Sequence, residues 1–370
     1  MDSPTPAHDH FRRKDLVEGL ASAIALAARG QGPVRIMHVC GTHERSVNRF
    51  GLRDLLPANV RIVAGPGCPV CICPLADLAA ARKLALKPGV ILATFGDMLG
   101  VPGPDGSLMD TRSLGADLRI VYSVSDALSL ATSNPEREIV FFSIGFETTT
   151  APTAAVVAGL EDRPVPNFSL ISSNRVVPEA LDFLLASGDL SVDGLLLPGH
   201  VSVIIGAGAY RFLVDRHQVP CAIAGFEPVD LLAGILEILE QRRSGKPAVH
   251  NSYSRAVLPE GNPKAKALMA KVYEPCDAVW RGLGVLPGTG LRLRPAFSRY
   301  DALIKFGIEG GGEGEDPAAG CLCAKVMVGL EEPAACPRFG GECVPESPVG
   351  PCMVSDEGTC RIHFEYGAGG

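Results

Sequence analysis

A thiol, an imidazole and a carboxylate occur within five positions in the stretch MHVCGTHE. They belong to Cys40, His43 and Glu44, which follow an apolar run at residues 34–39 that predicts a buried strand. Ligands of an open α/β sheet bind outside the carboxyl ends of its strands, so we expect these side chains at a binding edge. A cysteine near a histidine and a helix N-terminus is expected to have a lowered pKa, which suits a nucleophile or a metal ligand. The alternative is a buried structural cysteine, with Thr42 capping the next helix.

Two further cysteines, Cys68 and Cys71, form a Cys-x-x-Cys pair in the stretch GPGCPVC. The pair follows an apolar run at residues 60–63, so it is expected at the same sheet edge as Cys40. Such a pair at the start of a helix suits either a dithiol/disulfide couple or two metal ligands. The sequence of this stretch is compatible with both hypotheses.

Half of the twelve cysteines occur in the last fifty residues, among many glycines and prolines. These six are Cys321, Cys323, Cys336, Cys343, Cys352 and Cys360. A structural zinc site usually contains paired Cys-x-x-Cys knuckles, which this stretch lacks. Widely spaced thiolates in glycine-rich loops favour an iron–sulfur cluster, which needs four cysteines and leaves a pair for a redox-active disulfide. The spacing does not assign which four would bind.

The elements that must position these residues alternate between strand and helix from residue 34 to about residue 240. Apolar runs predict strands at 34–39, 60–63, 90–95, 118–124, 139–144, 168–171, 194–197 and 221–224. Continuous apolar strands separated by helices indicate an α/β fold with parallel sheets flanked by helices. We expect two α/β lobes rather than one eight-stranded sheet, with a cleft between them. The predicted boundaries are a tail and helix at 1–33, lobes at 34–134 and 135–241, and a connecting region with the loop-rich cysteine segment at 242–370.

Several predicted strands end in a glycine followed by a polar residue at the start of a helix. Asp97, Glu147, His200 and Glu227 occupy such positions and are expected on one rim facing the cleft. The two glutamates are equally well interpreted as helix-capping acids.

Composition limits the function classes. Hydrophobic residues make up 46% and charged residues 20% of the 370 positions, as in globular chains long enough for two or three domains. The formal net charge of −7 argues against a non-specific nucleic-acid surface. No apolar stretch predicts a membrane span. Twelve cysteines without a signal peptide predict a reducing compartment, the cytoplasm, where clustered cysteines more often bind metals or perform redox chemistry.

These motifs together resemble those of the hydrogenase maturation factor HypD family. The resemblance extends from about Ile36 to Tyr366 and includes the stretches CGTHE, GPGCPVC, GFETT, PGHV, CPRFG and PVGPCMVS. That family helps to build the iron centre of nickel–iron hydrogenases. The resemblance therefore implies a scaffold, with redox activity, on which an Fe(CN)2CO unit is assembled.

The resemblance also implies roles for individual residues. Cys40 would hold the iron that carries cyanide and CO, jointly with a cysteine of a HypC-type small chaperone. A HypE-type protein would donate the cyanide, and His43 and Glu44 would orient the site or move protons. Cys68 and Cys71 would either ligate iron or act as an electron-accepting dithiol.

In the C-terminal segment the same resemblance assigns a [4Fe-4S] cluster and an exchangeable cysteine pair. The cluster would be bound by Cys321, Cys336, Cys343 and Cys360. Cys323 and Cys352 would be the exchangeable pair.

Two other function classes remain open at the level of the sequence. One is a free-standing iron–sulfur oxidoreductase that acts on a protein disulfide. The other is a zinc-stabilised interaction protein with no redox role.

Overall fold

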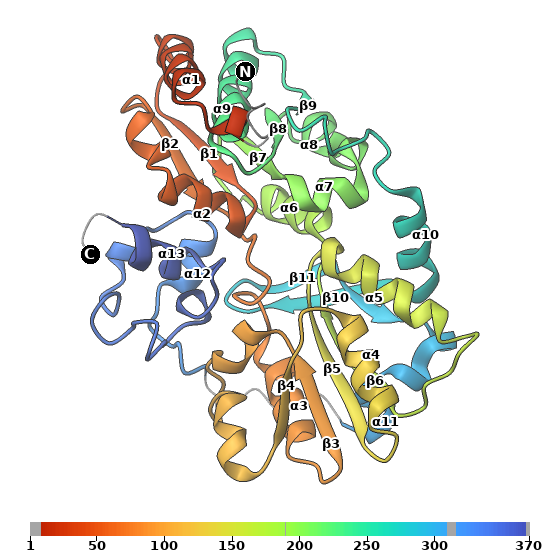
Figure 1. Cartoon of the computed structure of the whole chain (residues 1–370). Coiled ribbons are helices and arrows are strands. Elements are labelled where there is room, and N and C mark those ends of the chain that lie inside the picture. Colours follow the sequence, from red (N-terminus) through yellow and green to blue (C-terminus); the bar gives the residue numbers. More distant parts are fainter. Residues whose placement is uncertain (1–8, 189, 309–315, 368–370) are drawn as a thin grey trace, which may run out of the picture.

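The computed structural model describes residues 9–188, 190–308 and 316–367. Figure 1 shows two α/β lobes, a β-hairpin between them and a cysteine-rich C-terminal segment at one side. The predicted fold class is confirmed, because both sheets are parallel and flanked by helices. None of the helices in the described parts of the chain is long and apolar enough to cross a membrane.

Lobe A contains a five-stranded parallel sheet with the strand order β2-β1-β7-β8-β9. Its strands are β1 (Val34–His38), β2 (Val60–Ala64), β7 (Gly194–Pro198), β8 (Cys221–Ala224) and β9 (Val249–Asn251). One face, including Ile36 and Leu196, packs against helices α1 (Lys14–Ala27) and α9 (Pro228–Ser244). The other face carries Met37 and Leu197 and belongs to the core shared with the rest of the molecule.

Lobe B contains a four-stranded parallel sheet with the strand order β4-β3-β5-β6. Its strands are β3 (Val90–Thr94), β4 (Asp117–Ile120), β5 (Glu138–Gly145) and β6 (Phe168–Asn174). Alternate positions face opposite sides, so Leu92 joins the core that contains α3 (Leu75–Ala85), whereas Ile91 joins a second core on the other face of the sheet. Helices α4 (Val124–Ser133) and α5 (Glu147–Gly159) cover that second face.

The remaining elements connect the lobes or cover their edges. The α-helices are α2 (Gly41–Arg49), α6 (Val177–Ala186), α7 (Gly199–Ile205), α8 (Arg211–Asp215), α10 (Pro263–Val272), α11 (Ala302–Phe306), α12 (Cys323–Met327) and α13 (Thr359–Tyr366). Short 3-10 helices are η1 (Asp9–Arg12), η2 (Leu52–Leu55), η3 (Gly96–Gly100), η4 (Met109–Leu114), η5 (Ala207–Tyr210), η6 (Pro295–Tyr300), η7 (Pro333–Ala335) and η8 (Pro351–Met353).

The division of the strands between the sheets differs from the predicted one. All eight predicted strands form, but the sheet of lobe B extends from β3 to β6 and therefore crosses the predicted boundary at residue 134. The sheet of lobe A combines β1 and β2 with strands that follow residue 193, since β1 pairs with β7 through Ile36 and Gly194. Apolar periodicity identifies a strand but not its partner in a parallel sheet, because that partner is distant in sequence.

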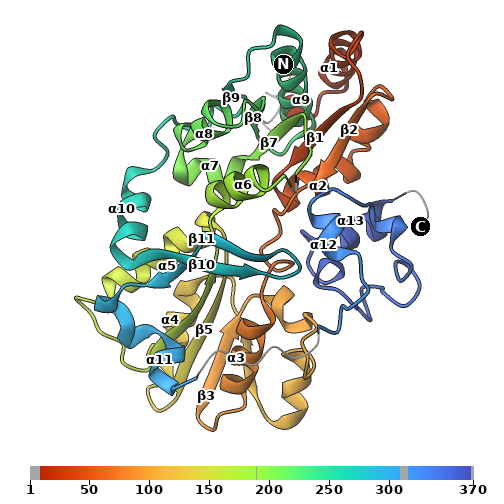
Figure 2. The same cartoon turned by 180° about the vertical axis from the view of Figure 1, so that it is seen from behind.

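The connecting region contains a hairpin that the sequence analysis did not predict. Strands β10 (Tyr273–Trp280) and β11 (Gly284–Leu293) pair in antiparallel fashion. Gly282 and Gly284 at its tip have φ angles of +80° and +84°, which favour glycine. Figures 1 and 2 show this hairpin between the two lobes, with its tip pointing toward the C-terminal segment.

The cysteine-rich segment, residues 316–367, is loop-rich as predicted and contains only short helices. It contacts both lobes. The Arg35 guanidinium of β1 donates to the Gly329 carbonyl at 2.7 Å, and the Ser355 hydroxyl donates to the Asp97 carboxylate of lobe B at 2.8 Å. Helix α13 lies against α2, so the segment covers the loop that follows β1.

Candidate functional site

Cys40 lies at the junction of three segments. It follows β1 with an extended backbone and directly precedes α2. A Cβ atom on Gly67 would lie 2.5 Å from the Cys40 backbone nitrogen, so the Cys-x-x-Cys loop is in close contact with Cys40. A Cβ atom on Gly41 would lie 2.4 Å from the Glu357 Cβ atom, so the C-terminal segment closes the other side. Cys40 is consequently only 8% exposed.

The predicted lowering of the Cys40 pKa is wrong. Burial, helped by the nearby charge of Glu357, raises the pKa of the Cys40 thiol to about 12. Hydrogen bonds from Thr42 and from the His43 amide act in the opposite direction but are outweighed. The helix start is present as predicted. The long-range contact with Glu357, 317 positions away, could not be inferred from local sequence.

Glu357 is the site residue that the sequence analysis missed. The Thr42 hydroxyl donates to the Oε1 atom of Glu357 at 3.0 Å. The alternative interpretation of Cys40 expected Thr42 to cap α2, but its side chain makes no capping hydrogen bond. Burial and the charge of nearby Asp97 raise the pKa of Glu357. A glutamate in a cysteine-rich tail has no local pattern that links it to a strand end so distant in sequence.

Glu44 has electrostatic partners on three sides. Its carboxylate accepts hydrogen bonds from Arg53 at 2.8 Å and from the His363 ring of α13 at 2.8 Å, and it also contacts the His38 ring. Burial alone would raise its pKa, but Arg53, His38 and His363 hold the pKa of Glu44 well below its usual value. Glu44 therefore joins β1, α2 and the C-terminal segment as a buried anion.

His43 is fully buried and faces the end of β8. Its Nε2 atom lies 3.3 Å from the Ala224 carbonyl, and its ring centre lies 5.2 Å from that of Phe226. Burial, together with the nearby His38, lowers the pKa of His43 to about 3. His43 is therefore neutral at physiological pH, and its Nδ1 atom has no hydrogen-bond partner in the described parts of the chain.

Cys68 and Cys71 are joined by a disulfide bond in the loop between β2 and α3. Both residues are buried, and the Cys71 amide donates to the Cys68 sulfur at 3.2 Å. In this structure the pair is therefore a disulfide and not two free thiols. Cys73, two residues further, is a buried thiol whose sulfur lies 3.7 Å from the Ser173 hydroxyl.

The six C-terminal cysteines come together although up to 39 residues separate them in sequence. The Cys323 thiol contacts the Cys352 thiol, and Cys352 in turn contacts Cys360. Cys360 also lies within electrostatic range of Cys321 and Cys343. Cys321 contacts the remaining member of the group, Cys336.

Hydrogen bonding to the Cys336 sulfur suits a metal-bound thiolate. Burial opposes the thiolate, but backbone amides of Leu322, Arg338 and Phe339 lower the pKa of Cys336. Amide groups directed at sulfur are a recurring feature of iron–sulfur sites, where they tune the cluster.

The donor set of the cysteine group is compatible with the predicted four-iron cluster. In the described residues, no three His, Cys, Asp or Glu side chains are placed to hold one metal ion together. A [4Fe-4S] cluster takes one cysteine on each of four irons, so its ligands surround a larger volume than those of one ion. Of the four cysteines that the resemblance assigns to the cluster, three are buried and one is half-buried, and all four belong to this group.

One cavity connects the disulfide loop with the cysteine-rich segment. It has a volume of about 240 Å³ and is lined by Cys71, Cys321 and Cys323 as well as by Arg281 and Asp316. The two groups of cysteines that the sequence singled out are therefore in contact with the same space.

The four rim residues have separate surroundings. Asp97 accepts from Ser355, and Glu147 is buried with its Oε1 atom accepting from the Val177 amide at 3.0 Å. Burial raises the pKa of Glu147 to about 8. His200 is exposed and stacks on Phe226 with ring centres 3.8 Å apart, whereas Glu227 caps α9 and pairs with Arg12. The capping interpretation thus holds for Glu227.

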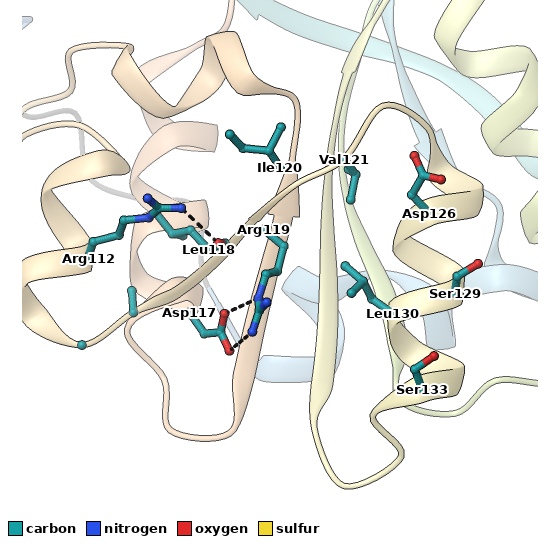
Figure 3. A pocket seen from close by; sticks show the side chains of 12 residues that line it. Arg112, Asp117, Leu118, Arg119, Ile120, Val121, Asp126, Ser129, Leu130 and Ser133 are labelled. Carbon is teal, nitrogen blue, oxygen red and sulfur yellow. Dashed lines mark hydrogen bonds and ion pairs between the residues drawn. The ribbon is translucent and has the colours of Figure 1, made fainter.

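A larger cavity, of about 940 Å³, lies along the outer edge of β4. Figure 3 shows its polar side chains, including Arg112, the Asp117–Arg119 ion pair and Asp126 of α4. The predicted site residues, all of which the structure describes, are not among the residues that line it.

The fold and the site define a two-lobed α/β protein in which a buried disulfide and a cysteine-rich segment meet at one cavity. A family model named HypD, described as the hydrogenase formation hypA family, matches residues 15–367. A hydrogenase maturation factor HypD of Azotobacter vinelandii is 43% identical over 97% of this chain and 96% of its own. The hydrogenase maturation factor HypD2 of Bradyrhizobium diazoefficiens is 42% identical over 97% of this chain and 96% of its own. A putative hydrogenase expression/formation protein of Methanocaldococcus jannaschii is 43% identical, with coverages of 90% and 92%.

The chain belongs to the HypD family. Its role is in hydrogenase maturation, as the predicted resemblance implied.

Proposed function

We propose that the protein is the scaffold on which the Fe(CN)2CO unit of nickel–iron hydrogenase is assembled. Cys40 would hold the iron together with a cysteine of a HypC-type chaperone, and a HypE-type protein would supply cyanide. A soft thiolate is a suitable ligand for the low-spin iron that cyanide and CO require. The iron unit is cargo, and the protein's own cofactor would be a [4Fe-4S] cluster bound by Cys321, Cys336, Cys343 and Cys360.

The observation that supports this proposal most strongly is the meeting of three thiol groups. Cys40 touches the Cys68–Cys71 loop through Gly67, and Cys71 shares a cavity with Cys323. The proposed iron anchor, the disulfide and the proposed cluster cysteines are therefore within one region. An interaction protein stabilised by zinc would have no use for a disulfide at that junction.

The residues around Cys40 would control the proton that must leave when the thiol binds iron. Burial keeps Cys40 protonated until a metal arrives, which protects it from oxidation. Glu357 is the nearby carboxylate that can accept this proton, and Thr42 holds it in place. His43, whose pKa is lowered to about 3, is a poor proton acceptor and would instead orient the loop after β8.

The paired cysteines would transfer electrons between the cluster and the junction. A cluster passes one electron at a time, whereas reduction of a disulfide takes two. Cys323 and Cys352 touch each other, and Cys352 also touches the proposed ligand Cys360. These contacts support a role in which the pair would pass two electrons to the Cys68–Cys71 disulfide, with a bound cluster as their source.

The test is an infrared spectrum of the anaerobically purified protein together with its small partner. We expect cyanide and carbonyl bands, together with the visible absorption of an iron–sulfur cluster. Cys40→Ala should abolish the bands and leave the cluster absorption unchanged, because Cys40 is not a cluster ligand. The matched control Cys221→Ala removes another buried thiol of lobe A and should preserve both.

Other results would favour the alternative classes. Cyanide bands that persist in Cys40→Ala contradict the scaffold role of this residue. A brown protein that exchanges disulfides but never carries iron–cyanide would be a free-standing oxidoreductase. A colourless protein with stoichiometric zinc would be an interaction protein.

A further inference from the structure

We propose that the tip of the β10–β11 hairpin, residues 281–283, holds Cys71 opposite Cys323, with Arg281 as the positioning residue. This inference rests on the electron transfer between the cysteine pairs described under the proposed function. The inference adds a specific route, in which disulfide exchange occurs between Cys71 and Cys323. This exchange depends on Arg281, which is not a thiol.

Arg281 contacts three segments at once. Its backbone amide donates to the carbonyl of Ile72, which directly follows Cys71, at 2.9 Å. Its guanidinium donates from Nη1 to the Pro102 carbonyl of lobe B at 2.9 Å. The same group forms a two-point ion pair with Asp316 at the start of the described C-terminal segment, with Nε at 3.0 Å. Arg281 is only 5% exposed, so these contacts replace nearly all of its hydration.

The neighbouring glycine places the hairpin tip directly on α12. Gly282 has a φ angle of +80°, and a Cβ atom there would lie 2.7 Å from the Ala324 Cβ atom. Ala324 follows Cys323, the first residue of α12. The tip therefore contacts the residue after Cys71 on one side and the residue after Cys323 on the other. Figures 1 and 2 both show the tip between the chain that follows β2 and the C-terminal segment.

The cavity identifies which sulfur atoms can meet. Cys71 and Cys323 both line it, whereas Cys68 and Cys352 are not among its described lining residues. Cys352 instead touches Cys323, where it can act as the resolving thiol. Thiol–disulfide exchange needs direct access of the attacking sulfur. Between the Cys68–Cys71 disulfide and the Cys323/Cys352 pair, the cavity provides this access only for Cys71 and Cys323.

The exchange then proceeds in two balanced steps. The Cys323 thiolate attacks the Cys71 sulfur, so a Cys323–Cys71 bond forms, the Cys68–Cys71 bond breaks and Cys68 leaves as a thiolate that takes up a proton. The Cys352 thiolate next attacks the Cys323 sulfur and releases Cys71 in the same way. The Cys68–Cys71 disulfide has gained two electrons, and the Cys323/Cys352 dithiol has been oxidised to a disulfide.

The experiment traps the intermediate in the full chain, purified anaerobically with its cluster absorption recorded. In a Cys68→Ser, Cys352→Ser background, oxidised glutathione forms a mixed disulfide with either Cys71 or Cys323. The other of these two thiols then displaces the glutathione and forms the Cys71–Cys323 disulfide. Peptide mass spectrometry should detect the Cys71–Cys323 disulfide. The mirror background, Cys71→Ser with Cys352→Ser, should form Cys68–Cys323 much more slowly. A faster Cys68–Cys323 product, or a Cys71–Cys321 product, overturns the pairing.

Arg281 is tested in the first background. Arg281→Gln should slow formation of the Cys71–Cys323 disulfide by roughly tenfold to hundredfold, the range expected when reacting groups are misplaced by about 1 Å. Arg281→Lys should slow it as well, because lysine lacks the planar fork that pairs with Asp316 and reaches Pro102. Arg255→Gln removes another two-point ion pair, with Asp230 in lobe A, and should leave the rate unchanged.

The outcomes separate this inference from the proposed function. Rates that do not change in Arg281→Gln, with the cluster and the melting temperature retained, overturn the positioning role and leave the electron transfer intact. Absence of both the Cys71–Cys323 and the Cys68–Cys323 products with Arg281 in place overturns the electron transfer itself. If the Arg281 variants do not fold, Asp316→Asn decides, because this partner is one-third exposed and its loss weakens the same contact.

Discussion

At the scale of single residues, burial decides the chemistry more than residue type does. Cys40 has a histidine and a helix start beside it, yet burial and Glu357 raise its pKa to about 12. Glu147 has one carboxylate oxygen without a partner among the described residues, and burial raises its pKa to about 8. Both groups are therefore neutral at pH 7. A thiol at a strand end near a histidine, or an acid on the surface, would instead be expected to ionise more readily.

The first prediction concerns the charge beside Cys40. Glu357→Gln removes a negative charge, so the Cys40 pKa should fall and more thiolate should be present at pH 8–9. Burial remains the larger cause, so we expect iodoacetamide to label Cys40 up to about tenfold faster, which corresponds to one pKa unit. Labelling is followed by peptide mass spectrometry. Glu342→Gln changes an exposed acid of the same segment and should have no effect; equal rates in both variants contradict the assignment.

The second prediction concerns Glu147. Its folded pKa is above the unfolded value, so its contribution to stability is complete below pH 4.5 and is lost as the pH rises toward 8. Glu147→Gln should flatten this decline by a few kcal/mol, at about 1.4 kcal/mol per pKa unit. Urea unfolding at pH 5 and pH 8 measures the effect. The Glu136→Gln variant, which changes an exposed acid just before β5, is the control. An unchanged pH slope in Glu147→Gln would mean that its carboxyl is already ionised in the folded state.

At the scale of elements, the C-terminal segment is attached to lobe A by α13 and α2. Glu44 of α2 accepts from His363 of α13 at 2.8 Å and also neutralises Arg53. Removing one partner of a buried ion pair leaves an uncompensated charge, whereas removing an outer contact does not. Loss of Glu44 should therefore lower the free energy of unfolding more than loss of His363.

The third prediction compares these two residues. Glu44→Gln should reduce the free energy of unfolding by roughly 3–5 kcal/mol, because it leaves the half-buried Arg53 guanidinium without its buried carboxylate partner. His363→Ala should cost only about 1–2 kcal/mol, as for the loss of one hydrogen bond to a charged group. It should still release the C-terminal segment to limited proteolysis. The folded pKa of Glu44 is depressed, so the stability that Glu44 provides is present above pH 4.5 and is lost in acid. Equal losses from the two variants would contradict a central role for Glu44.

At the scale of the whole molecule, the chain passes from lobe A to lobe B and back, and then covers the junction with its last fifty residues. The hairpin tip, the disulfide loop and the cysteine-rich segment meet there (Figure 1). This arrangement lets one cavity serve cysteines that lie about 250 residues apart in sequence, as Cys71 and Cys323 do.

The fourth prediction follows from that arrangement. Cys323→Ser and Cys352→Ser should retain the cluster absorption but lose hydrogenase maturation, because electrons no longer reach the Cys68–Cys71 disulfide. Thiol trapping should then find Cys68 and Cys71 in a single redox state. Cys276→Ser changes a half-buried thiol of the hairpin strand β10 and serves as the control. If both variants mature hydrogenase normally, the pair has only a structural role.

Local sequence was sufficient for the strands and for the cysteine groups. Apolar runs predicted all eight strands of β1 to β8, because burial on both faces leaves a continuous pattern in each strand. The β10–β11 hairpin escaped because its exposed and buried positions alternate irregularly around a bulge at Cys276 and Ala278. Its one local indication was the pair of glycines at 282 and 284.

The sequence by itself identified the candidate residues: Cys40, the Cys-x-x-Cys pair and the six C-terminal cysteines. Only the tertiary structure decided how β1 to β8 divide between two sheets, which acid lies beside Cys40 and which residue joins the disulfide loop to α12. The physical reason is that strand pairing, burial and electrostatic environment come from segments far apart in the chain. Glu357 lies near Cys40, 317 positions away, and Arg281 contacts Ile72, 209 positions away. No local pattern records such contacts.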